Sequence, residues 1–277
     1  MMIDSHQHFW NFNPVEYPWI GEGKDVLRRD FLPEDLAPEI KETGISGVVS
    51  VQARQSLDET WQLLNYSDRH EWICGVVGWV PLIHPDLNRL LPTVASHPKL
   101  RGVRHILHDE TDPFYMLRED FNHGIRALKP FKLAYDILIF ERHLPQTIEF
   151  VDRHSNQVFV VDHLAKPRVR DGVISPWREN IESLSRRPNV YCKISGLVTE
   201  ANYTRWTEAQ LRPYIDVVID AFTPGRLMFG SDWPVCLAAA SYRRWVDVVT
   251  RAISHLTDSE RDRIWSGTAI EAYGLSR

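Results

Sequence analysis

The sequence predicts an α/β protein folded as a single (β/α)8 barrel, or TIM barrel, and two observations carry this prediction. Eight short apolar segments alternate with eight segments of helical period along the 277 residues. The apolar segments are rich in β-branched residues and apolar on both faces, as in buried parallel strands. Eight such units in a chain of this length fit a closed barrel with an outer ring of helices.

The predicted strands are apolar runs that end where polar residues begin. The first run ends on His6 and His8, which project to the same side because a strand repeats every two residues. The last run leads into Ser231 and Asp232. The eight expected strands are residues 3–8, 45–52, 73–80, 100–106, 132–138, 157–163, 189–195 and 226–231.

The predicted helices show apolar residues at helical spacing, and several carry signals at their ends. Gly44 follows the first helix, Ser56 or Asp58 precedes the second, and Pro188 stops the sixth. A capping box at 257–260 opens an additional C-terminal helix. The eight helices of the repeating units are expected at 33–43, 57–70, 85–97, 117–129, 145–156, 177–187, 207–222 and 241–256.

An open, doubly wound sheet is the structural alternative to the barrel. No Gly-x-Gly-x-x-Gly motif follows any predicted strand, which disfavours the nucleotide-binding form of that fold. No linker, internal repeat or low-complexity segment divides the chain, so residues 1–277 are expected to form one domain. Residues 11–30 form a long first loop, rich in Trp, Tyr and Pro, that is expected near the barrel mouth.

Composition and charge exclude several classes of protein. A hydrophobic fraction of 43% and a charged fraction of 25% are typical of a soluble globular domain. The net charge of -5, with scattered basic residues, argues against nucleic acid as a partner. No segment resembles a signal peptide or a membrane span, so we expect a cytoplasmic protein. Cys74, Cys192 and Cys236 are expected to be free thiols, and the oligomeric state stays open.

Polar residues collect after the predicted strands. In a (β/α)8 barrel the catalytic groups stand at the carboxyl ends of the strands, so these side chains are expected to converge. A single strand-end Asp or Arg is more often a loop cap or an ion pair, and it is the convergence that indicates a site. The strand-end residues are His6, His8, Gln52, Arg54, Trp79, Arg104, His105, His108, Tyr135, Asp136, Asp162, His163, Lys166, Lys193, Ser195, Ser231, Asp232 and Trp233.

Five stretches at these strand ends resemble a known family. They are IDSHQHFW at 3–10, GVRH at 102–105, VDHLAKP at 161–167, CKISGL at 192–197 and MFGSDWP at 228–234. The chain resembles the amidohydrolase superfamily, and within it the lactonases of sugar lactones such as fuconolactone and rhamnonolactone. Pyrone-dicarboxylate lactonase is a more distant likeness. The resemblance covers nearly the whole chain and implies an enzyme of sugar acid metabolism.

The resemblance also implies roles for individual residues. His6 and His8 match the first-strand pair, His163 a later-strand histidine, and Asp232 the general base on the eighth strand. These four residues form the candidate site for a single metal, for which zinc is the best choice. Arg104 and Asp136 stand where two-metal members carry a bridging ligand and a histidine, so we expect no metal or one divalent ion.

The implied reaction is hydrolysis of a small-molecule sugar lactone to the sugar acid. Asp232 is expected to activate water, while His163 and Arg104 stabilise the charge that develops on the carbonyl oxygen. The alternatives are another reaction of the superfamily, either decarboxylation or ester or amide hydrolysis, and a non-catalytic barrel that binds a sugar acid. The residues expected to contact substrate are His6, His8, Gln52, Arg54, Trp79, Tyr135 and Trp233.

Overall fold

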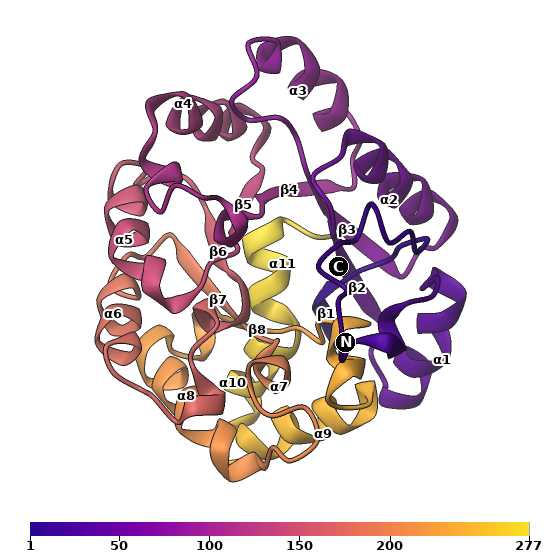
Figure 1. Ribbon diagram of the computed structural model, residues 1–277, viewed down its shortest axis with the longest axis vertical. Coiled ribbons are helices and arrows are strands. Elements are labelled where there is room, and N and C mark those ends of the chain that lie inside the picture. The colour runs from indigo at the N-terminus through magenta and orange to yellow at the C-terminus, as the bar shows by residue number, and fades with distance from the viewer. Residues whose placement is uncertain (277) are drawn as a thin grey trace.

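A computed structural model describes residues 1–276 and shows a barrel of eight parallel strands in sequential order (Figure 1). All eight predicted strands are present, and the (β/α)8 fold is confirmed. The strands are β1 (Ile3–Gln7), β2 (Gly47–Val51), β3 (Ile73–Gly78), β4 (Leu100–His105), β5 (Ala134–Ile137), β6 (Phe159–Val161), β7 (Val190–Ile194) and β8 (Leu227–Phe229).

The barrel closes where the first strand meets the segment after the last one. The backbone N–H of His8 donates to the carbonyl of Trp233 at 2.7 Å, and that of Asp232 donates to the carbonyl of His6 at 2.8 Å. The buried Asp4 carboxylate accepts from the N–H of Ser231 at 2.8 Å. This seam therefore places the end of β1, with His6 and His8, beside the segment after β8, with Asp232.

The strands β6 and β8 are shorter than predicted for a local reason. The chain leaves β6 before His163 and leaves β8 before Asp232, and both residues adopt the left-handed conformation, with φ of 54° and 57°. Such a backbone does not continue a strand. The predicted strand at 157–163 extends into this turn because apolar character alone does not reveal it, whereas the predicted strand at 226–231 already ends before Asp232.

The helices surround the strands as an outer ring (Figure 1). The eight predicted ones are confirmed with small shifts at their ends, and Ser56 caps the second by accepting from the N–H groups of Asp58 and Glu59. The ring consists of α1 (Pro33–Thr43), α2 (Leu57–Arg69), α3 (Leu87–Ala95), α4 (Glu119–Leu128), α5 (Leu144–Asp152), α6 (Trp177–Leu184), α8 (Glu208–Phe222) and α9 (Tyr242–Ala252).

Three further α-helices lie within residues 1–276. The capping box at Thr257 opens α10 (Asp258–Asp262), as expected, and the chain then continues into α11 (Thr268–Tyr273). The four-residue α7 (Leu197–Glu200) after β7 was not predicted, because four residues are too few to show a helical period. Within residues 1–276, no helix has both the length and the apolar character needed to cross a membrane.

The interior of the barrel is filled by mostly apolar side chains, and α11 packs against them. Inward-facing strand residues pack against α11 in one cluster, which includes Ile3, Val49, Val51, Val77, Ala134, Val160, Met228, Ala269, Ala272 and Tyr273. A second and larger cluster lies between the strands and the outer helices. The barrel is therefore solid on the side of α11, and only the carboxyl ends of the strands are free to form a site.

The position of Tyr135 contradicts its expected role as a substrate contact. Tyr135 is fully buried on the outer face of β5, where its ring packs edge-on against Phe121, Phe150 and Phe159. Its neighbour Asp136 faces inward instead, since adjacent strand residues point to opposite faces. Tyr135 is thus a packing residue between the sheet and the helices.

We predict that Tyr273→Phe destabilises the protein by about 1.5–3 kcal/mol, the range for a hydrogen bond to a charged group. The Tyr273 hydroxyl lies 2.8 and 2.9 Å from the two oxygens of the buried Asp136 carboxylate. Urea unfolding followed by circular dichroism measures the change. Tyr191→Phe is the matched control, because that hydroxyl donates to the half-exposed Glu271, and an equal loss in both variants would contradict the prediction.

Candidate active site

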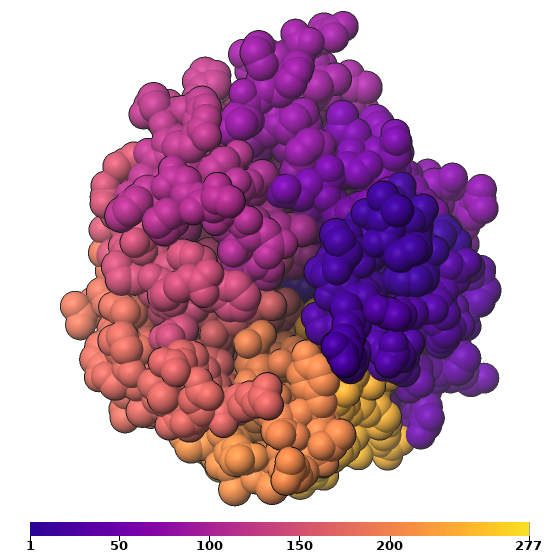
Figure 2. All heavy atoms as spheres, in the orientation of Figure 1, coloured from indigo at the N-terminus to yellow at the C-terminus, as the bar shows by residue number. Residues whose placement is uncertain are grey.

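A cavity of about 270 Å³ opens at the carboxyl ends of the strands. Figure 2 shows the corresponding hollow near the middle of the face, bordered by the indigo N-terminal segment and by later segments in magenta and orange. His8, Arg104, His163 and Asp232 line the cavity, so four of the predicted site residues converge on it. The remaining wall is formed by Trp19, Lys24, Ala53, Ile106, His108, Asp109, Leu138, Phe140, Lys166, Thr199, Glu200, Tyr203, Val235 and Ala238.

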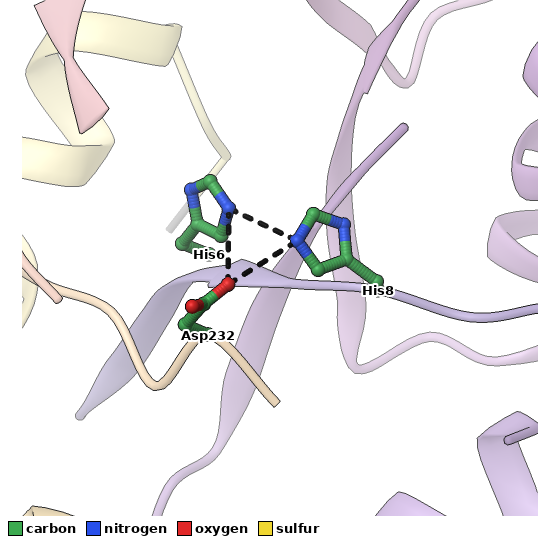
Figure 3. Close-up of side chains that lie close together, drawn as sticks. All are labelled: His6, His8 and Asp232. Carbon is green, nitrogen blue, oxygen red and sulfur yellow. Dashed lines mark hydrogen bonds and ion pairs between the residues drawn. The ribbon is translucent and has the colours of Figure 1, made fainter. Parts of the chain in front are cut away.

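Two histidines and one carboxylate form a compact triangle beside the cavity (Figure 3). His6 Nε2 lies 3.2 Å from His8 Nε2, and Asp232 Oδ1 lies 3.8 Å from the first nitrogen and 3.4 Å from the second. Zinc–ligand bonds of about 2.0–2.1 Å in a tetrahedron separate the ligand atoms by about 3.3 Å. The three atoms therefore fit a single zinc-sized ion.

The outer nitrogens of both histidines also have suitable partners. His8 Nδ1 lies 2.8 Å from the carbonyl of Val51, so it carries the proton and leaves Nε2 free as a ligand. His6 Nδ1 lies 3.2 Å from Asp162 Oδ1. Burial lowers the pKa of His6 well below its usual value despite the attraction of Asp162. Both imidazoles are thus oriented by a partner on Nδ1, which is what a metal site needs.

His163 reaches the cavity from a strained turn. Four consecutive residues, 163–166, have φ between 48° and 58°, a region that costs about 1–2 kcal/mol for each residue with a side chain. Packing holds the turn, because Leu164 and Ala165 are fully buried and the Trp177 indole N–H donates to the Leu164 carbonyl at 2.7 Å. The strain is thus offset by the core and directs His163 and Lys166 inward.

The His163 ring is fixed between two residues of the segment after β7. Its Nδ1 lies 2.8 Å from Ser195 Oγ. The ring also lies against Gly196, where a Cβ atom would come within 2.6 Å of His163 Cγ. Burial lowers the pKa of His163 well below its usual value, although Asp232 opposes this. His163 is therefore a neutral, immobilised imidazole whose Nε2 lies 3.8 Å from Asp232 Oδ1.

Asp232 is a buried carboxylate that stays ionised. Burial alone would raise its pKa, but the facing His163 and His8 and the Lys166 ammonium outweigh burial and place the pKa of Asp232 below its usual value. The positive φ of 57° turns the side chain toward His6 and His8. The geometry presents a proton acceptor at the floor of the cavity.

Arg104 supplies positive charge at the same floor. One terminal nitrogen donates to Asp162 Oδ2 at 2.8 Å and also lies 3.4 Å from His6 Nε2. The other side of the guanidinium donates to the Gln52 side-chain oxygen and to the Gln52 carbonyl. Gln52 does not line the cavity, so it orients Arg104 rather than facing a ligand.

A buried lysine completes the ion network behind His6. Lys193 Nζ lies 2.5 Å from Asp136 Oδ2, 2.9 Å from Asp162 Oδ1 and 3.1 Å from His6 Nδ1. Burial raises the pKa of Asp136 to about 6. Burial also opposes ionisation of Asp162, but Lys193, His6 and Arg104 outweigh it and hold the pKa of Asp162 well below its usual value.

This network has a consequence for metal binding. His6, Asp162 and His163 also offer ligand atoms within 4.8 Å of one another. Side-chain cations already occupy this second group, because Lys193 and Arg104 both bind the Asp162 carboxylate. Among the described residues, the triangle of His6, His8 and Asp232 is therefore the better metal site.

Three more of the expected substrate contacts lie away from the cavity wall. Trp233 is almost fully buried between Phe9 and Phe31. Arg54 pairs with Glu16 of the first loop at 2.5 Å, and Trp79 donates to His105. These side chains serve packing and loop anchoring in this arrangement, which corrects the expectation that they face a ligand.

Sequence reasoning missed most of the outer wall. Trp19 and Lys24 come from the first loop, which is expected near the mouth from its aromatic content, although Lys24 itself is not singled out. Glu200 and Tyr203 come from α7 and the segment behind it, where no periodic pattern exists. Lys166 belongs to the predicted strand-end residues, but the sequence pattern assigns it no role.

Comparison with known proteins gives consistent matches over the full chain. A family model described as amidohydrolase matches residues 3–275. The L-fucono-1,5-lactonase of Burkholderia multivorans is 42% identical over 286 residues, covering 99% of this chain and 96% of the relative. The L-fucono-1,5-lactonase of Burkholderia ambifaria is 34% identical over 279 residues, with the same coverage.

A solved structure shows the same fold. The crystal structure of an amidohydrolase from Burkholderia multivorans with bound zinc superposes with a TM-score of 0.96 at 42% identity and covers 100% of both chains. The resemblance indicated by the strand-end motifs is confirmed. Since the family model spans nearly the whole chain and both relatives exceed 30% identity, the protein belongs to the amidohydrolase family.

Proposed function

We propose that this protein hydrolyses a sugar lactone of the L-fuconolactone type to the open sugar acid. The observation that carries the proposal is the ionised Asp232 carboxylate, which faces three imidazoles at the floor of a cavity. Two relatives that cover 99% of this chain are L-fucono-1,5-lactonases, which supports the substrate class. The cavity volume of about 270 Å³ suits a single sugar ring.

The residues suggest a simple sequence of bond changes. Asp232 takes a proton from a water molecule while the water oxygen bonds to the lactone carbonyl carbon. The bond from this carbon to the ring oxygen then breaks, and the ring oxygen takes the proton back as it leaves as a hydroxyl. The product is the sugar acid with its ring opened.

Arg104 and His163 are placed to stabilise the charge on the carbonyl oxygen. Arg104 brings a fixed cation to the cavity floor, where Gln52 and Asp162 hold its orientation. When the Ser195 hydroxyl, 2.8 Å away, donates to Nδ1, His163 carries its proton on Nε2 and offers it to the cavity. Donors that are oriented before the reaction act without a reorganisation cost at the transition state.

The triangle of His6, His8 and Asp232 is suited to bind one metal ion. His6, His8 and Asp232 would hold one zinc ion, which when bound supplies Lewis-acid polarisation of an oxygen. The zinc in the crystal structure of the 42% identical amidohydrolase supports this choice of metal. Without zinc, the Nε2 atom of His8, which lines the cavity, is free to accept a hydrogen bond from water or from a sugar hydroxyl.

We predict that Asp232→Asn lowers kcat for L-fuconolactone by at least about a hundredfold, because general-base catalysis contributes about 10²–10⁴-fold. A pH-indicator assay measures the released acid, and circular dichroism checks the fold. Asp247→Asn is the control, since Asp247 forms a surface ion pair with Arg243. A well-folded Asp232→Asn enzyme with nearly normal kcat would rule out the role of Asp232.

We predict that Gly196→Ala lowers kcat about a hundredfold with a smaller change in KM, because the new Cβ displaces the His163 ring. Gly172→Ala is a matched control. Gly172 has φ of +66°, nearly equal to the +67° of Gly196, but no atom lies within 4 Å of the position that its Cβ would occupy. Equal activity losses in the two variants would assign the effect to backbone strain instead of His163.

We predict at most one zinc ion per chain and activity that largely survives dialysis against a chelator. Arg104 lies 3.4 Å from His6 Nε2 and already brings positive charge to this floor, and a lactone is an activated ester. Elemental analysis of the wild type and of His8→Asn, with parallel assays, tests this. Two ions per chain, or activity that vanishes on chelation and returns with zinc, would contradict the prediction.

A further inference from the structure

Charged side chains on the cavity wall balance one another. Three are cationic and three are anionic, namely Lys24, Arg104, Lys166, Asp109, Glu200 and Asp232. Arg104 is additionally paired with Asp162 directly behind the wall. The protein side chains therefore leave no surplus of positive charge for an anionic ligand.

Two of the wall cations, Lys166 and Lys24, are each held by neighbouring residues. Lys166 Nζ lies 3.5 Å from Glu200 Oε1 and 5.4 Å from the Phe140 ring centroid. Lys24 donates to the Trp19 carbonyl at 3.1 Å, and its Nζ lies 5.3 Å from the Trp19 ring centroid. Burial and the nearby Lys166 ammonium lower the pKa of Lys24, while the charges of Glu200, Asp232 and Asp109 attract its ammonium.

Glu200 is an acidic residue whose side chain is largely buried in the cavity wall. It ends the short α7, with its side chain only 21% exposed, and it faces the cavity beside Lys166. A carboxylate brought to Lys166 by a ligand would also lie close to Glu200, with little water to screen the repulsion. A sugar hydroxyl at the same place would instead donate to Glu200 and accept from Lys166.

We propose that the Lys166–Glu200 pair is a specificity filter that admits uncharged hydroxylated lactones and excludes lactones that carry a free carboxylate. This inference rests on the proposed function and adds a specificity-determining residue to it. The rings of Trp19, Phe140 and Tyr203 line the same wall and offer flat apolar surfaces to the C–H faces of a sugar ring.

A matched pair of lactones tests the filter. L-Fucose is the 6-deoxy form of L-galactose, so L-galactonolactone keeps the configuration of L-fuconolactone. L-Galactarolactone differs from it by a carboxylate in place of the terminal CH₂OH group. The readout is the ratio of kcat/KM for the neutral lactone to that for the acidic one, measured on chelator-treated enzyme so that metal content is equal.

We predict a ratio of at least about one hundred in the wild type and a ratio at least about tenfold smaller in Glu200→Gln, which leaves Lys166 without its carboxylate partner. Lys166→Met should enlarge the ratio, because it removes the cation and keeps Glu200. Glu208→Gln, a surface control that pairs with Arg251, should leave it unchanged. A ratio near one in the wild type, or ratios within twofold in wild type and Glu200→Gln, would overturn the filter.

Different experimental outcomes would contradict the filter and the proposed function. If the wild type hydrolyses none of the lactones, including L-fuconolactone, the proposed function is wrong. The filter is then judged by calorimetric binding of the two lactones to Asp232→Asn with and without Glu200→Gln. A gain in affinity for the acidic lactone of about tenfold supports the filter without any turnover, and no gain overturns it.

Discussion

Four buried charges behind His6 organise the floor of this barrel. Lys193 and Arg104 face the carboxylates of Asp136 and Asp162, and both cations also lie within 3.4 Å of a nitrogen of His6. Burying one of these groups alone would be very costly, whereas the four together are neutral and hydrogen-bonded. Because the members stand on β4, β5, β7 and the segment directly after β6, the cluster fixes the mutual positions of half the barrel strands.

The backbone is strained after β6 and β8 because the site places an imidazole and a carboxylate at positions whose conformation favours glycine. His163 and Asp232 both stand in the left-handed region, where glycine is the favoured residue. Glycine has no side chain and cannot supply an imidazole or a carboxylate, so the chemistry opposes the conformational preference. The surrounding packing and backbone hydrogen bonds hold these turns in place, as at other functional sites where strain is stored.

Much of the fold and part of the site follow from the sequence for physical reasons. Buried strands and amphipathic helices have periods that can be counted, and motifs such as His-x-His carry their side-chain direction in the spacing. The orientation of β5 is a feature that these periods do not predict. Tyr135 and Asp136 are neighbours and must face opposite sides, and the choice between them depends on the distant Lys193. Lys24 and Glu200 lie on irregular or very short segments, whose course is set by tertiary contacts and has no period to read.

The seam between β1 and the segment after β8 has a consequence for folding. Asp232 donates its backbone N–H to His6, and Ser231 reaches Asp4 across 227 positions of sequence. Bringing together two residues so far apart in the sequence costs conformational entropy, because the whole intervening chain is closed into a ring. A partly folded chain with seven strands in place would lack the Asp–His pair altogether. The Asp232–His6 contact therefore exists only when the first strand meets the segment after the last one, so the candidate site is complete only in a closed barrel.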